Sequence, residues 1–163
     1  MNVPGHVVRR VGAEDIPRVQ ALFALDPHYW EQVEAQPLRP DEAALLLDER
    51  PPGISLAQKQ AFLVDDIALL DMSEGYPEPT TWFLGLIFLA PSVRGRGLGT
   101  RLLEALCDHV RANGGRALRL AVAQQHPEAR RLYDRLGFQY VVTRTRTTYI
   151  GAKVELDVME RAL

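Results

Sequence analysis

Apolar and polar positions along this chain follow two different periods. Seven segments carry short apolar runs or apolar residues at every second position, which predicts strands at 6–11, 60–64, 67–73, 81–90, 118–123, 138–149 and 152–160. Helical spacing occurs instead in five segments, 15–25, 28–35, 40–50, 100–107 and 127–136. Strands and helices that succeed one another in this way indicate an α/β protein.

Length and composition point to one ordinary globular unit. A chain of 163 residues with 47% hydrophobic content can bury one substantial core, so we expect a single domain, 1–163. The N-terminus has no apolar leader, and the longest apolar run, about ten residues, is too short to span a bilayer. We therefore expect a cytoplasmic protein without a membrane partner. The single cysteine, Cys107, lies on a leucine-rich helical face, which favours a buried thiol, and the four scattered histidines predict no metal site.

A glycine-rich turn separates the apolar run 82–91 from the helical segment that starts at Thr100. It reads Arg94-Gly95-Arg96-Gly97-Leu98-Gly99. Glycines remove the Cβ atoms that keep a ligand away from the backbone, and the first amides of the following helix are unpaired at the positive end of its dipole. The turn therefore predicts an anion site suited to a phosphate or pyrophosphate.

The spacing of the turn excludes two common phosphate loops. A P-loop needs Lys-Ser or Lys-Thr after its last glycine, whereas Gly99 is followed by Thr100-Arg101. The dinucleotide fingerprint needs unevenly spaced glycines and an acidic residue at the later ribose position, whereas Gly95, Gly97 and Gly99 are evenly spaced and no acidic residue stands at that position. These absences disfavour a nucleotide hydrolase and leave the pattern Arg-x-x-Gly-x-Gly at a strand-to-helix junction.

A second motif follows the predicted strand 118–123. The segment Leu132-Tyr133-Asp134-Arg135-Leu136-Gly137-Phe138 ends the last predicted helix. Together, the two motifs resemble the signatures of the GNAT superfamily of acyl-CoA-dependent N-acetyltransferases. The resemblance implies a mixed, mostly antiparallel central sheet flanked by helices, with splayed central strands. It divides the chain into an acceptor-side region 1–80, an acetyl-CoA-binding core 81–140 and a terminal hairpin 141–163.

The resemblance also implies where the co-substrate acetyl-CoA binds, with no metal involved. In the family, the pantetheine arm bonds to backbone groups of a central strand, and the glycine loop binds the pyrophosphate. Histidine stands at position 126, where the family often has asparagine, and this residue can still donate to a carbonyl or phosphate. The implied contacts are Ile87, Phe88, Leu89, Arg94, Gly95, Arg96, Gly97, Leu98, Gly99, Thr100, His126 and Tyr133.

The catalytic residues follow from the same comparison. Tyr133 matches a tyrosine that acts as general acid toward the departing thiolate in many members, and a phenol with a pKa near 10 is protonated at neutral pH. An attacking amine also has to lose a proton. The segment 81–90 has no carboxylate, and position 121, often glutamate in enzymes that acetylate protein N-termini, is alanine. Candidates for the general base are therefore Asp71, Glu74, Glu31 and Glu34.

Charge is divided along the chain in a way that suits two unlike ligands. Residues 1–82 hold 6 basic and 14 acidic side chains, whereas residues 83–140 hold 9 basic and 4 acidic ones. An acidic first half fits a cationic amine and a basic centre fits a polyanionic nucleotide. The arginines lack interleaved exposed aromatics, so we expect no nucleic-acid partner. Aromatic residues that can wall the amine site are Tyr29, Trp30, Tyr76 and Trp82.

The sequence thus predicts an acetyl-CoA-dependent N-acetyltransferase in which a bound amine attacks the thioester directly. Alanine at position 121 favours a small-molecule amine over a peptide amine. A non-catalytic acyl-CoA-binding or sensor domain is the alternative, because the central strand lacks a carboxylate. Edge strands and the terminal hairpin offer surfaces for a homodimer.

Overall fold

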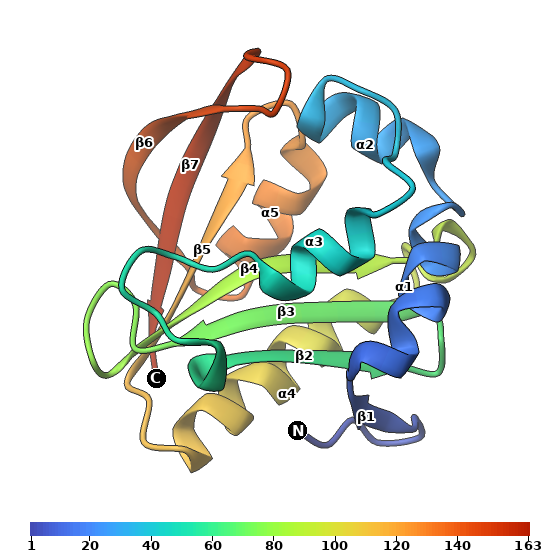
Figure 1. Ribbon diagram of the computed structural model, residues 1–163. Helices are drawn as coiled ribbons and strands as arrows, with labels where there is room; N and C mark the ends of the chain where they lie inside the picture. The colour runs from blue at the N-terminus through green and yellow to red at the C-terminus, as the bar shows by residue number, and fades with distance from the viewer.

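The computed structural model describes all 163 residues, and its centre is an open sheet of seven strands (Figure 1). Their order across the sheet is β1-β2-β3-β4-β5-β7-β6, and β4 with β5 is the one parallel pair. This confirms the mixed, mostly antiparallel α/β fold. The strands are β1 (Val8–Arg10), β2 (Lys59–Val64), β3 (Ala68–Glu74), β4 (Thr81–Leu89), β5 (Ala117–Ala123), β6 (Gln139–Thr147) and β7 (Lys153–Ala162).

Five α-helices cover the two faces of the sheet. They are α1 (Ile16–Phe23), α2 (Pro27–Glu34), α3 (Glu42–Asp48), α4 (Leu98–Ala112) and α5 (Pro127–Arg135). Helix α4 begins two residues before its predicted start, because Gly97 takes a left-handed conformation (φ 79°) that lets the chain turn directly into the helix. Helix α2 begins at Pro27 after Asp26, whose carboxylate caps it by accepting from the Tyr29 amide at 3.1 Å.

Two apolar cores lie on opposite faces of the sheet because side chains alternate along each strand. On β3, Leu70 and Met72 face α4 and α5, whereas Leu69 packs with α1, α2 and α3. Each fully buried leucine contributes about 1.5–3 kcal/mol to folding. Cys107 is buried in the α4 core, as predicted. Because side chains alternate, Asp71, which follows Leu70 on β3, lies on the face covered by α1 and α3, and that face is polar at this position.

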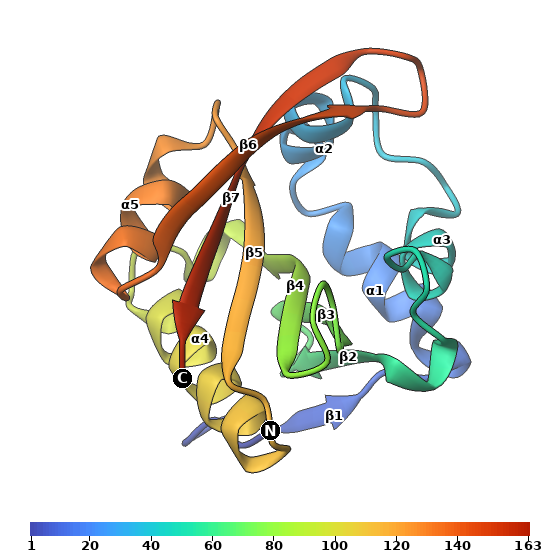
Figure 2. The same ribbon diagram turned by 90° about the vertical axis from the view of Figure 1, so that its left-hand side faces the viewer.

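The two central strands separate halfway along their length. Residues Thr81–Leu84 of β4 pair with Ala117–Leu120 of β5, and both strands continue beyond that point without pairing. The register of β3 against β4 also shifts there, so that Gly85 has no partner between Leu84 and Leu86. Figure 1 shows β4 and β5 diverging from their paired ends, and Figure 2 shows α4 and α5 on one side of the sheet with α1, α2 and α3 on the other. The splayed central strands are therefore present in this chain.

The C-terminal hairpin of β6 and β7 turns at Gly151, as predicted, but β7 is inserted between β5 and β6. The far end of this hairpin contacts the helical region of the N-terminal half. Arg146 forms an ion pair of 2.8 Å with Glu34 of α2, and the guanidinium of Arg39 lies 3.7 Å above the ring of Tyr149. The hairpin thus ties residues that follow position 140 to those that precede position 50. No helix is both long and apolar enough for a transmembrane segment.

Candidate active site

The glycine loop forms a cradle of free amides. No backbone N–H from Gly95 to Thr100 donates to another backbone group, and the first that does is Arg101, to the Gly97 carbonyl at 3.2 Å. Both Gly95 and Gly97 have a positive φ, and a Cβ on either would meet no atom within 4 Å, so the loop surface is open. Consecutive unpaired amides at a helix N-terminus suit a pyrophosphate.

Helix packing explains the third glycine. A Cβ on Gly99 would lie 3.3 Å from the Leu132 side chain of α5, closer than an ordinary contact. Glycine at this position therefore lets the first turn of α4 approach α5 closely. The neighbouring Leu98 is a buried core residue, so only its backbone faces the cradle, and Thr100 is half-buried.

Arg94 does not point freely into solvent. Its Nη1 donates to Asp26 at 2.6 Å, its Nε donates to the Leu89 carbonyl at 2.9 Å, and its guanidinium lies 5.6 Å from the Phe88 ring. These contacts join the glycine loop to the end of β4 and to the N-terminus of α2. The Arg96 side chain is exposed and unpaired, which leaves it available to an anionic ligand.

We call the region where β4 and β5 continue without pairing, beyond Leu84 and Leu120, the splay. The strand residues expected to bind pantetheine lie there, beyond the last β4–β5 pair. The ring of Phe88 is buried against α1 and α2, while Ile87 and Leu89 pack at the margin of the α4 core. Their side chains are thus core residues. These residues can therefore contact a ligand only through their backbone N–H and C=O groups on the edge of β4 that no longer pairs with β5.

Two tyrosines, from α2 and α5, lie near enough to each other for one to affect the pKa of the other. Tyr133 of α5 is 7% exposed, and burial raises its pKa to about 12. The ring of Tyr29 of α2 lies 5.3 Å from Phe88, and burial followed by the proximity of Tyr133 raises the pKa of Tyr29 above its ordinary value. Both phenols are therefore protonated at neutral pH. A protonated phenol in a poorly solvated place is able to donate to a developing thiolate.

His126 lies directly before α5 and beside Tyr29. Its ring stacks on Tyr29 with the ring centres 5.9 Å apart. The Nε2 atom is buried and has no hydrogen-bond partner, while Nδ1 lies 3.6 Å from Glu128. An unpartnered ring nitrogen at this position is consistent with the expected contact to the co-substrate.

Of the base candidates, Asp71 pairs with β4 beyond the last pair of β4 with β5. Its register partner is Leu86, one residue after the unpaired Gly85, and its Oδ2 lies 3.0 Å from where a Cβ on Gly85 would be. Lys59 of β2 lies 2.8 Å from Oδ1 and 2.9 Å from Oδ2. Burial, only partly offset by Lys59, raises the pKa of Asp71 to about 6. A carboxylate with this pKa is mostly ionised at neutral pH and is still a competent base.

The other carboxylates are placed differently. Glu74 is the register partner of Trp82, which puts it on the α4 face, opposite to Asp71. Glu31 is exposed and contacts His28 at 3.2 Å in solvent. Glu34 is buried, its Oε1 contacts Arg146, and burial raises its pKa, but its Oε2 has no partner. Of the two buried candidates, Asp71 is the one that pairs directly with β4, whereas Glu34 belongs to α2.

The four aromatic residues expected around the amine separate in the fold. Tyr29 packs against Phe88, as described above. Trp30 is 4% exposed and stacks in the core against Phe88, and Trp82 is 1% exposed in the core under α4, so neither lines an open surface. Tyr76 is half-buried in the loop before β4, with its ring 5.7 Å from that of Phe83.

Sequence reasoning missed three residues of this site, although each left a signal. Lys59 is one of two lysines in the chain and begins an apolar strand. Gly85 interrupts the apolar run 82–91, and glycine within a strand often marks a bulge or a close approach. Asp26 precedes Pro27, which is a typical start of a helix.

Comparisons with known proteins agree with this geometry. Residues 19–138 match the model of the acetyltransferase (GNAT) family. The protein YhfO of Bacillus subtilis, named as an uncharacterized N-acetyltransferase, is 25% identical over 134 residues, which cover 81% of this chain and 89% of YhfO. The 5-NmdU N-acetyltransferase of Pseudomonas phage PaMx11 is 42% identical over 62 residues, 38% of this chain and 40% of the phage protein. The crystal structure of an acetyltransferase from Thermus thermophilus superposes over the full length of both chains, with a TM-score of 0.78 and 25% identity.

Proposed function

This chain belongs to the acetyltransferase (GNAT) family and is an acyltransferase, and from that premise we propose that it moves an acetyl group from acetyl-CoA to a primary amine. The amine attacks the thioester directly, without a covalent enzyme intermediate. The observation that carries the proposal is the cradle of free amides from Gly95 to Thr100 beside the splay of β4 and β5. A pyrophosphate bound in this cradle would leave the attached arm to follow the unpaired edge of β4.

Acetyl-CoA supplies the thioester and several negatively charged phosphate groups. The proposed contacts to these phosphate groups are the loop amides, Arg96 and the free Nε2 of His126. Backbone groups of Ile87 to Leu89 would hold the pantetheine arm, and one well-placed N–H on the thioester carbonyl contributes about 3 kcal/mol to transition-state stabilisation. We assign Arg94 to support of the loop, because Asp26 and the Leu89 carbonyl already hold its guanidinium.

We propose Tyr133 as the general acid that protonates the departing sulfur. We propose Asp71 as the base that accepts the amine proton, directly or through one water. Gly85 is solvent-exposed in a strand of otherwise buried or half-buried residues, and the Asp71 carboxylate lies just beneath it. An amine that approaches over Gly85 would therefore meet the base and the thioester from the same side.

The acceptor class is a small-molecule amine in this proposal. Alanine at position 121 lacks the carboxylate that is common at this strand position in enzymes for protein N-termini. One relative, the phage protein, is named as a 5-NmdU N-acetyltransferase. We assign acceptor recognition to residues 1–80 together with the end of the hairpin 141–163, since Arg146 and Tyr149 contact Glu34 and Glu49 there.

The test is release of CoA thiol from acetyl-CoA with pooled polyamines, amino acids, aminoglycosides and peptide N-termini, against an amine-free control. Acetyl-CoA binding is measured in the same samples by calorimetry. We expect amine-dependent release with a small-molecule pool. Binding with no release in any pool would contradict catalysis and favour the acyl-CoA sensor, and release with peptides alone would contradict the acceptor class.

A further inference from the structure

Lysine is rare in this protein, and one of its two lysines is buried. The chain has Lys59 and Lys153 beside 17 arginines. The side chain of Lys59 is only 4% exposed, whereas Lys153 on β7 is exposed. A buried ammonium is costly unless its charge is paired and its protons are bonded. The contacts of Lys59 therefore indicate what holds it inside.

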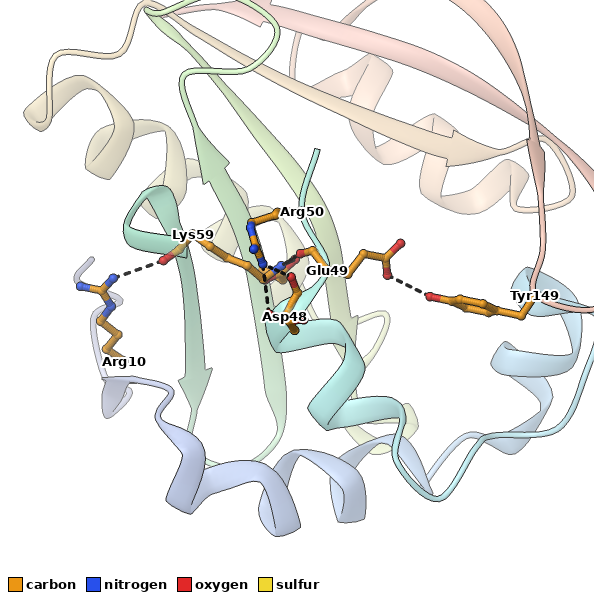
Figure 3. A network of polar contacts seen from close by, with 7 residues as sticks. Arg10, Asp48, Glu49, Arg50, Lys59 and Tyr149 are labelled. Carbon is orange, nitrogen blue, oxygen red and sulfur yellow. Dashed lines mark hydrogen bonds and ion pairs between the residues drawn. The ribbon is translucent and has the colours of Figure 1, made fainter. Parts of the chain in front are cut away.

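The Lys59 ammonium donates to two acceptors, Asp71 Oδ2 at 2.9 Å and the Glu49 carbonyl after α3. It also lies 2.8 Å from Asp71 Oδ1 as an ion pair, and this buried oxygen has no hydrogen-bond partner. The Lys59 backbone is held as well, because Arg10 Nη2 donates to its carbonyl at 3.2 Å (Figure 3). Lys59 is thus fixed at both ends, with its charge directed at Asp71.

The position of Asp71 gives this ion pair a use beyond packing. The carboxylate lies under Gly85, where the β3–β4 register shifts and where β4 parts from β5. A side chain at position 85 would press on Oδ2, whereas glycine leaves this oxygen next to an exposed backbone. An ion pair that served only to stabilise the fold would not need an exposed glycine backbone next to its carboxylate.

We infer that Lys59 is a positioning residue for acetyl transfer, one that keeps the Asp71 carboxylate ionised and fixed beneath Gly85, where it receives the proton of the attacking amine. This inference rests on the proposed function. In the step, the amine nitrogen forms a bond to the acetyl carbon as the carbon–sulfur bond breaks, and the electron pair leaves with sulfur. Asp71 takes the N–H proton and Tyr133 gives its O–H proton to sulfur. Both then exchange protons with solvent, so no other reactant is needed.

The charges around Asp71 leave this task to Lys59. Burial raises the pKa of Asp71 and Lys59 opposes that rise, while the nearby Glu49 carboxylate adds to it. Glu49 itself turns away and accepts from the Tyr149 hydroxyl at 3.2 Å (Figure 3). Arg50 is held by Asp48 at 3.0 Å, and β4 presents only Gly85 and Leu86. Lys59 is therefore the one cation in contact with the carboxylate.

The direct experiment is a carbon-13 titration of the aspartate carboxyls in the full-length protein. The Asp71 signal is assigned by its loss in Asp71→Asn. We expect an apparent pKa of about 6 in the wild type and in the Lys153→Met control. In Lys59→Met we expect it to rise by about 1 unit or more, because removal of a cation in contact with a carboxylate has an effect of that size.

The second readout is the pH dependence of kcat/KM for the acceptor found in the thiol-release screen, divided by the fraction of free amine at each pH. We expect the acid limb to move upward in Lys59→Met by the same amount as the Asp71 pKa, with acetyl-CoA affinity unchanged. Activity lost at neutral pH should therefore return at alkaline pH. A purely structural loss would lower the curve at every pH without moving its limb.

Folding of Lys59→Met is checked by thermal unfolding. If that variant does not fold, Lys59→Gln replaces it, since its amide still donates but carries no charge. An unmoved Asp71 pKa, or an unmoved acid limb beside a shifted pKa, overturns the inference. Failure of the proposed function looks different, because the wild-type protein itself would then release no thiol with any amine.

Discussion

The substitution Gly85→Ala tests whether the Asp71 carboxylate acts from beneath β4. The backbone φ at position 85 is not in the left-handed region, so alanine is tolerated there without backbone strain. Its methyl group would lie 3.0 Å from Asp71 Oδ2, while ordinary contacts begin at 3.4 Å. The carboxylate therefore has to withdraw by about 0.4 Å from the surface at which we expect the amine.

The magnitude follows from that displacement. A misplacement of about 1 Å can cost about 100-fold in rate, so a shift of about 0.4 Å corresponds to roughly sixfold if the cost grows exponentially. Stability should change little. Replacing glycine at a compatible φ gains about 0.4–1 kcal/mol through the unfolded chain, and mild overpacking costs about 1–3 kcal/mol. We expect a net loss between about 0 and 2.6 kcal/mol.

The assay compares kcat/KM for the amine in wild type, Gly85→Ala and Gly85→Val, with chemical unfolding and acetyl-CoA affinity measured on each. The larger valine should displace the carboxylate further and lower kcat/KM by roughly 100-fold or more. Acetyl-CoA affinity serves as the internal control and should stay within about twofold, a small difference on the free-energy scale. A folded Gly85→Val enzyme with wild-type kcat/KM would refute the assignment of Asp71 and the approach over Gly85.

Three further predictions concern the acid, the ion pair and the loop. Tyr133→Phe should lower kcat by roughly 100-fold or more with unchanged acetyl-CoA affinity, and equal turnover at all pH values would exclude the acid role. Asp71→Asn or Lys59→Met alone should cost about 3–5 kcal/mol of unfolding free energy, because each leaves a buried charge unpaired, whereas Asp71→Asn/Lys59→Met together should cost far less in a double-mutant cycle. The pKa of Asp71 in the folded protein, about 6, lies above its ordinary value of 3.8. The unfolding free energy of the wild type relative to that double variant should therefore fall by up to about 3 kcal/mol as pH rises from about 4 to 6. A difference that does not change with pH would show that Asp71 is not desolvated. Arg94→Ala removes an ion pair, a hydrogen bond and a cation–π contact at a half-exposed side chain and should lower the unfolding free energy by about 1–2 kcal/mol. Proteolysis of α2 should become faster, and slower proteolysis than in the wild type would count against the link through Asp26.

Local pattern was sufficient for most of the fold. Strands at 60–64, 67–73 and 118–123 and the helix at 127–136 lie within two residues of the observed elements, because period and helix-end residues are local properties. The glycine loop was equally readable, since a phosphate cradle needs only short spacing and a following helix. The two cores also follow from which positions alternate.

Pairings across the fold required the tertiary structure. The sequence by itself determined the α/β elements, the glycine loop and the family, because contiguous residues carry those signals. The structure alone decided that Arg94 turns to Asp26, that Trp30 and Trp82 lie in cores, and that Lys59 meets Asp71 beneath Gly85. Each of these depends on strand register and on segments distant in the chain, and a shift of one residue in register would send Asp71 to the opposite face.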